Sequence, residues 1–171
     1  MWTEILKYTL PAVLVIVVTY LLLHQLFKND TERRQFELKK INLSTITPVR
    51  LKAYERLMLL IERINPNRFL INKVEADMNS LDLHGALLRD MRREFEHNIS
   101  QQIYVSNELW EIITNAYENL IQLINTCAAQ CPAEEPASKL ATMIITVYES
   151  ADETALDVAR QALKDEVKEI L

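Results

Sequence analysis

Glycine is nearly absent from this chain of 171 residues, which contains only Gly85. Loops that cradle phosphates and folds that bind dinucleotides need several glycines at fixed spacing, so neither can be built here. Sheet-rich folds also favour glycine at their tight turns. Leu, Ile, Ala, Glu and Asn dominate instead, and apolar residues recur at helical spacing over long stretches. The composition therefore predicts an all-α fold.

Cysteine and histidine are also scarce. Cys127 and Cys131 are the only cysteines, and two thiols without a nearby histidine make neither a disulfide framework nor a good zinc site. His97 forms an E-x-x-H pair with Glu94, next to Glu96. A carboxylate metal site in a helical bundle needs a second such pair. A metal-dependent enzyme using Glu94, Glu96 and His97 is therefore only an alternative, and neither a catalytic residue nor a cofactor is predicted.

A long apolar run stands at the start of the chain. From Tyr8 to Leu23, tyrosine is the only ionisable side chain. A helix rises about 1.5 Å per residue and needs around 20 such residues to cross a bilayer core. A cleaved signal peptide would be followed by a small-residue cleavage site, which the sequence HQLFKNDTERR does not contain. Residues 1–27 are therefore predicted to form an uncleaved transmembrane anchor.

Charge is distributed unevenly along the chain. Residues 28–56 contain eight Lys and Arg against four Asp and Glu, whereas residues 133–171 contain four against nine. Five of the basic residues follow the apolar run closely: Lys28, Arg33, Arg34, Lys39 and Lys40. The positive-inside rule then predicts a membrane protein with its amino terminus outside and its carboxy-terminal domain in the cytoplasm.

Residues 28–46 are predicted to form a basic juxtamembrane stalk. Such a stalk can lie near anionic lipid heads, which leaves a lipid-surface sensor as a further alternative. A nucleic-acid partner is not expected, because acidic residues dilute the patch and Phe36 is its only stacking ring. In the stretch RDMRREFE, Arg89, Arg92 and Arg93 also alternate with acidic residues, a mixture typical of a solvated helix face.

About five helices are predicted after the stalk, in an antiparallel bundle over residues 47–171. The first begins at the start signal Thr47–Pro48 and ends at Asn65–Pro66, and an irregular connector follows. The second has Ser80 as its cap and an apolar seam of Leu88, Met91 and Phe95. The others are expected after Ser106 to about Gln130, from Ala137 to Glu149, and from a cap at Asp152 to the carboxy terminus.

The stretch EFEHNISQQIYVS, residues 94–106, is predicted to be a joint between the second and third helices. When the apolar seam of the second helix is continued at heptad spacing, it reaches Asn98 and Gln102. A buried amide in such a seam can set the register of helix packing. Ser106 can cap the next helix. Asn98, Gln102 and Ser106 are therefore the expected structural polar joint.

Two apolar rows run along the third helix. One contains Leu109, Ile112, Ala116, Leu120, Leu123 and Cys127, and the other contains Trp110, Ile113, Tyr117, Ile121 and Ile124. Polar residues are confined to a narrow stripe, so the helix is expected to be buried on two sides. Either the helix is internal to its own bundle, or the second row is a surface that meets a partner chain.

The stretches ITPVRLKAYERLMLLIERINP, EFEHNISQQIYVS and ELWEII resemble a group of small membrane-anchored proteins of Bacteroidota. The resemblance runs from the anchor to at least Thr126, and it implies a membrane location without implying an activity or any functional residue. The sequence thus predicts a single-pass scaffold, adaptor or accessory subunit of a larger inner-membrane assembly. Its expected partners are the lipid bilayer and other protein subunits.

Overall fold

The computed structural model describes residues 19–20, 24, 46–75 and 77–170. The chain divides into two compact units, residues 1–47 and 48–171.

In the first unit, Thr19, Tyr20 and His24 are helical, and the rings of Tyr20 and His24 stack with their centroids 6.1 Å apart. The rest of the predicted anchor and the five basic residues of the predicted stalk lie outside the described residues. No helix within the described ranges has the length and apolar character needed to cross a membrane.

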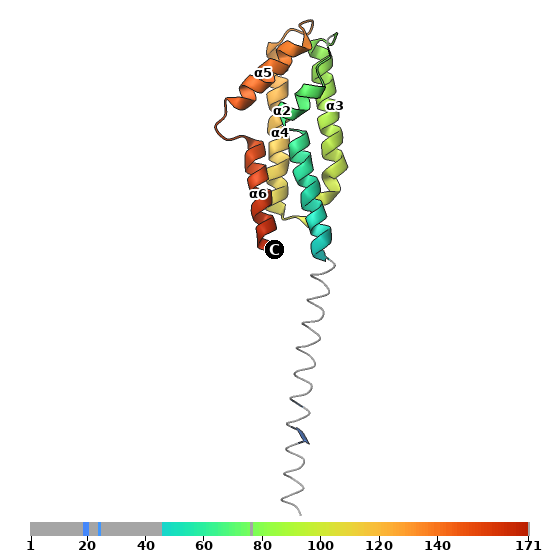
Figure 1. Ribbon diagram of the computed structural model, residues 1–171, viewed down its shortest axis with the longest axis vertical. Helices are drawn as coiled ribbons and strands as arrows, with labels where there is room; N and C mark the ends of the chain where they lie inside the picture. Colours follow the sequence, from blue (N-terminus) through green and yellow to red (C-terminus); the bar gives the residue numbers. More distant parts are fainter. Residues whose placement is uncertain (1–18, 21–23, 25–45, 76, 171) are drawn as a thin grey trace, which may run out of the picture. The chain divides into compact units, whose positions relative to one another are not determined.

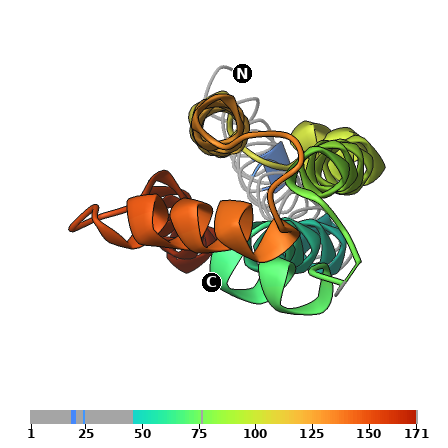
Figure 2. The same ribbon diagram turned by 90° about the horizontal axis from the view of Figure 1, so that it is seen from above.

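Every regular element in the described part of the second unit is helical, which confirms the predicted all-α class. A helix described from residue 46 to residue 63 leads into this unit. The elements that follow are α2 (Pro66–Phe69), η1 (Leu70–Asn72), α3 (Ser80–Asn98), η2 (Ile99–Tyr104), α4 (Asn107–Gln130), α5 (Ala137–Glu149) and α6 (Ala155–Ile170). The 46–63 helix, α3, α4 and α6 run lengthwise, and α5 crosses one end of the bundle (Figures 1 and 2).

Each lengthwise helix contributes one buried seam to a common core. On α4 the seam is Leu109, Ile113, Ala116, Leu120, Ile124 and Cys127, which takes members from both predicted rows. On α3 the seam is Leu83, Leu87 and Met91. Leu88 and Phe95, which the sequence placed in that seam, are only partly buried. Both residues lie beside the core seam, on the side of α3 that faces α4.

The starts of two helices differ from the predicted caps. Asn79, rather than Ser80, caps α3 by accepting a hydrogen bond from the Asp82 amide at 2.8 Å. The cap predicted for α6 at Asp152 is also wrong, because the structure uses Thr154. Thr154 and Asp157 stand three residues apart and each accepts from the backbone amide of the other, as in a capping box.

The connector after the first helix is more regular than predicted. Pro66 opens the short α2, and the side chain of Asn65 accepts from the Asn67 amide at 3.0 Å. Proline suits the first helical position because its missing amide would have no intrahelical partner there. The η1 turn then continues the segment before α3 begins.

Two loops meet at the end of the bundle where α3 begins and α4 ends. The Ser80 amide donates to the Glu135 carbonyl at 2.7 Å, and the Ala137 amide donates to the Met78 carbonyl at 3.0 Å. The Ser80 side chain is 3% exposed and donates to the same Glu135 carbonyl at 3.0 Å. Ser80 therefore ties the two loops together instead of capping its helix.

Candidate functional site

The segment between α3 and α4 is a tight corner held by side-chain hydrogen bonds. Asn98, at the end of α3, is 5% exposed, and its amide group donates to the Glu94 carbonyl at 2.8 Å. Ser106 is the N-cap of α4, and its hydroxyl accepts from the Leu109 amide at 3.1 Å. The structure therefore places Asn98 and Ser106 in positions that hold the corner.

Gln102, the third residue expected at this joint, is exposed, and Gln101 is buried in its place. The residues after Asn98 form the 3-10 helix η2 rather than a continuation of α3. A 3-10 helix turns about 120° per residue, against about 100° for an α-helix. A step of three residues from Asn98 thus returns to the same side at Gln101. The heptad extrapolation to Gln102 was wrong because it assumed α-helical geometry.

A polar cluster joins three elements at the same end of the bundle. Glu166 of α6 accepts hydrogen bonds from the Tyr54 hydroxyl at 2.6 Å and from the Ser106 amide at 2.9 Å. The Ser106 hydroxyl donates to the same carboxylate. Arg50 donates to the Tyr54 hydroxyl at 2.8 Å and to the Tyr104 carbonyl at 2.9 Å. The cluster links the beginnings of the 46–63 helix and α4 to the end of α6.

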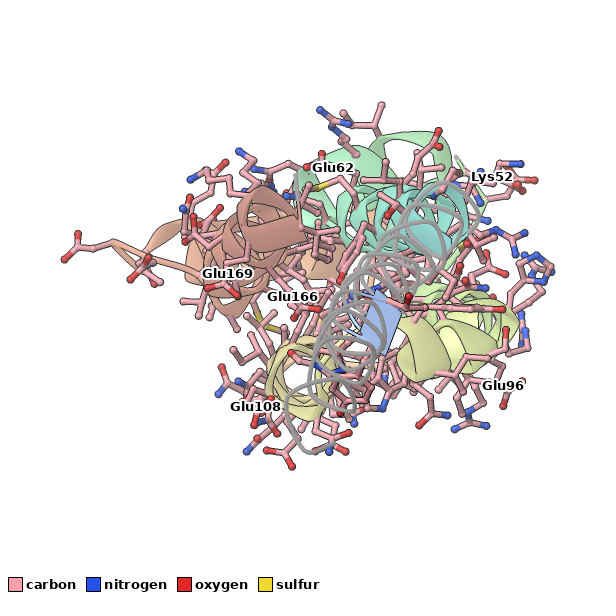
Figure 3. All side chains as sticks on the ribbon, turned by 90° about the horizontal axis from the view of Figure 1, so that it is seen from below. Lys52, Glu62, Glu96, Glu108, Glu166 and Glu169 are labelled. Carbon is pink, nitrogen blue, oxygen red and sulfur yellow. The ribbon has the colours of Figure 1, made fainter. Side chains whose placement is uncertain are left out.

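The cluster shifts the pKa values of its acidic members in opposite directions. Burial acts to raise the pKa of Glu166, but the hydrogen bonds from Ser106 and Tyr54 and the charge of Arg50 outweigh it, so the pKa is lowered. Burial and the hydrogen bond to Glu166 raise the pKa of Tyr54 to about 12. Glu166 lies toward the middle of the bundle, whereas Glu108 lies at its edge (Figure 3). A carboxylate that accepts several hydrogen bonds from its own fold stabilises the packing of the elements that it joins.

Of the three residues of the alternative metal site, one is engaged by the fold and two are exposed. Glu94 pairs with Arg63 of the 46–63 helix at 3.2 Å, while Glu96 and His97 are exposed near the end of α3. Within the described ranges, no group of three or more acidic, histidine or cysteine residues could hold a metal ion.

Cys127 and Cys131 are buried free thiols. Burial raises the pKa of Cys127, which favours the protonated and unreactive form. The sulfur of Cys131 lies 3.2 Å from the Ser80 hydroxyl, where α4 ends. Both side chains therefore contribute to packing at the end of the bundle that α5 crosses.

The five residues named as a possible partner surface are divided between the core and the edge of α4. Ile113 and Ile124 are each 2% exposed, so at these two positions the row is internal to the bundle. Trp110, Tyr117 and Ile121 are partly buried. At about 100° per residue the row spreads over about 80° of the helix surface, and Ile113 and Ile124 lie on its core side.

The aromatic part of this row packs against α3. Phe95 stacks on Trp110 and Tyr117, with ring centroids 5.6 and 4.3 Å apart. These contacts hold the last turn of α3 against the first half of α4. Most of the row is thus internal to the bundle, and only its outer edge reaches a surface.

A groove runs along that outer edge between α3 and α4 and encloses about 610 Å³. Leu88 of α3 and Tyr117 and Ile121 of α4 supply its apolar part, and all three are partly buried. Figure 2 shows α3 and α4 side by side, with α5 and α6 on another side of the bundle. At one end His84 bridges to Asn125, with its Nε2 2.8 Å from the amide oxygen.

Charges of opposite sign stand on the two rims of the groove. Arg92 on α3 and Glu118 on α4 are both exposed and line it. Burial raises the pKa of Tyr117, and the charge of the nearby Arg92 opposes that rise. The ion pairs of α3 within the described residues use other side chains: Asp90 with Lys73 and Arg93, and Glu94 with Arg63. An apolar floor with a polar rim is the usual anatomy of a protein interface.

Comparison with known proteins identifies a family for this chain, but that family has no assigned activity. Residues 1–170 match the Family of unknown function (DUF7935). The chain belongs to this family. No curated protein and no solved structure matches the DUF7935 chain. The resemblance seen in the sequence runs to at least Thr126, and the family match continues from there through the end of α6.

The α3 side of the groove was missed from the sequence of this DUF7935 protein. Leu88 was assigned to the core seam and Arg92 to a solvated face, although their spacing of four residues places them on one stripe of α3. The polar cluster was also missed. Arg50 and Tyr54 stand four residues apart, a spacing that can be seen in the sequence. Glu166, which completes the cluster, lies 112 residues beyond Tyr54, and no local pattern connects it to them.

Proposed function

We propose that this DUF7935 protein is a membrane-anchored scaffold, adaptor or accessory subunit of a larger assembly in the bacterial inner membrane. It acts by binding other protein subunits rather than by catalysis. Residues 1–27 form its single-pass anchor, with the amino terminus outside and the helical bundle in the cytoplasm. Residues 28–46 form the basic stalk beside the lipid surface.

The groove between α3 and α4 is the observation that carries this proposal. Its partly buried apolar residues, Leu88, Tyr117 and Ile121, lie between an exposed arginine and an exposed glutamate. The helices that form it are packed together by the stacking of Phe95 on Tyr117 and Trp110. An apolar surface that is already formed before binding loses little conformational entropy on binding, which favours its use as an interface.

The binding role is tested by extracting the full chain from native membranes in mild detergent and measuring the size of the complex. The wild-type chain should migrate as part of an assembly larger than itself. Ile121→Asp places a charge in the groove and should release the chain from that assembly, whereas Thr142→Asp on the exposed side of α5 should not. Thermal unfolding of each variant separates loss of binding from loss of folding. Equal complex size for both folded variants would contradict the proposal.

Topology is tested by a reporter fused after Leu171. The positive charges that follow Phe27 favour a cytoplasmic bundle, so the fusion should have cytoplasmic activity. A reporter that is active in the periplasm would overturn the proposed orientation.

A further inference from the structure

The rim charges of the α3–α4 groove have a self-complementary arrangement. Arg92 stands on the α3 rim and Glu118 on the α4 rim. The two residues are at a similar height along the bundle, because Tyr117, next to Glu118, stacks on Phe95, one turn from Arg92. Neither residue forms an ion pair with any other described residue, whereas Arg93 and Glu94 of α3 do.

A two-fold axis along the length of the bundle would place two such grooves face to face. The rotation sets α3 of one copy opposite α4 of the other and keeps every residue at its own height. Each Arg92 would then face Glu118 of the second copy, and this contact would occur twice. The apolar side chains of Leu88 and Ile121 would meet between the two charge pairs. The same rotation keeps residue 46 of both copies at the same end, as two chains anchored in one membrane require.

We propose that the α3–α4 groove binds a second copy of this chain in a parallel two-fold dimer, held by reciprocal Arg92–Glu118 pairs around an apolar centre. The inference rests on the proposed binding function and names its partner. In a two-fold pairing each groove meets its own copy, so the arginine of one rim must stand level with the glutamate of the other.

The size of the groove indicates a weak dimer that depends on the membrane. The 19 residues of α3 extend about 28 Å, and two adjacent helices are about 20 Å wide, so the projected face is about 560 Å². A standard stable interface buries about 800 Å² on each partner. Anchoring in one membrane raises the effective concentration of the copies and offsets this deficit. The bundle alone is therefore expected to be monomeric at low micromolar concentration, and the full chain paired in membranes.

Charge exchange in the full-length chain tests the pairing. Two differently tagged copies are expressed together and recovered from membranes through one tag. Arg92→Glu alone, or Glu118→Arg alone, in both copies should lower recovery of the second tag by at least about fivefold, because like charges then face each other twice. The double variant with both exchanges should restore recovery. The Arg93→Glu variant is the matched control and should leave recovery unchanged, since Arg93 pairs with Asp90 within its own chain.

A crosslinking experiment tests the same contact without reversing the charge of either residue. One tagged copy carries Arg92→Cys and the other Glu118→Cys, and a short bis-maleimide is added to isolated membranes. The mixed pair should crosslink more strongly than either variant paired with itself, and the buried Cys127 and Cys131 should give little background.

The outcomes separate this inference from the proposed function. Loss of pairing in the single variants, with recovery in the double variant, supports the dimer. Unchanged recovery in folded single variants, or no recovery in a folded double variant, overturns it. If Ile121→Asp still releases the chain from a complex that contains only one copy, the dimer is wrong and the binding function stands. If neither experiment shows an effect of the groove, both are wrong.

Discussion

Removing the Tyr54 hydroxyl is the sharpest test of the polar cluster at the η2 end of the bundle. Tyr54→Phe deletes one donor to Glu166 at 2.6 Å and one acceptor for Arg50 at 2.8 Å, and it leaves the packed ring in place. The ring is part of the core, since Tyr54 is 2% exposed. The substitution therefore isolates hydrogen bonding from packing.

The expected loss is moderate because the remaining partners stay satisfied. A hydrogen bond to a charged group contributes about 1.5–3 kcal/mol. Glu166 keeps both donors of Ser106, and Arg50 keeps the Tyr104 carbonyl. The side chain of Arg50 is 33% exposed, so water compensates part of its loss. We expect Tyr54→Phe to lower the free energy of unfolding by about 2 kcal/mol.

Glu166→Ala should cost more than Tyr54→Phe. It leaves the Tyr54 hydroxyl and both donors of Ser106 without their acceptor. We expect a loss of about 3 kcal/mol, since removing one partner of a partly buried charged network leaves the others unpaired.

Urea denaturation of a fragment from Ser44 to Leu171, followed by circular dichroism, measures both losses. A decrease of about 2 kcal/mol also corresponds to a fall in melting temperature on the order of 8 °C for a domain of this size. Tyr104→Phe is the matched control, because the contact of Tyr104 within the cluster is made by its carbonyl and not by its hydroxyl. If Tyr54→Phe is no more destabilising than Tyr104→Phe, the hydrogen bonds do not stabilise the fold and the reasoning is refuted.

Two further predictions follow from burial and charge. The pKa of Glu166 is lowered from 4.5, so its ionised form stabilises the fold above that pH, and the contribution is lost as the pH falls through the lowered value. The difference in unfolding free energy between wild type and Glu166→Gln should therefore shrink between pH 6 and pH 3, and a constant difference would contradict the assignment. Leu120→Ala should cost about 2–5 kcal/mol in the same fragment, whereas Leu81→Ala should cost under about 1 kcal/mol, because Leu120 is 4% and Leu81 60% exposed. Equal losses at the two positions would show that α4 is not packed as described.

Several features of the fold could be predicted because their causes are local. The bounds of α4 and α5 follow from a capping serine, from the prolines after Cys131 and from uninterrupted apolar periodicity, and the structure agrees with them. The polar stripe of α4, which includes Glu111 and Glu118, is exposed as its spacing indicated. Helical periodicity and end signals depend on residues a few positions apart, so the sequence alone contains them.

Other features could not be predicted, because they depend on the local backbone geometry or on a contact with a distant loop. The 3-10 geometry of η2 changed the phase of the chain after Asn98 and buried Gln101 instead of Gln102. Ser80 looked like a cap in the sequence, but a loop 55 residues away supplies an acceptor for its hydroxyl. A change of about 20° per residue, or one distant carbonyl, is enough to reverse such an assignment.

Periodicity and end signals along the chain were enough to predict that the described bundle is helical, where its long helices lie and which residues are candidates for apolar packing. The packing of the helices against one another settled which side of each helix faces the core. It divided the row from Trp110 to Ile124 between the interior and the groove, and it brought Arg92 and Glu118 to the two rims of one groove. The reason is physical: helix formation is driven by neighbours along the chain, whereas a groove or a polar cluster exists only where helices far apart in sequence pack together.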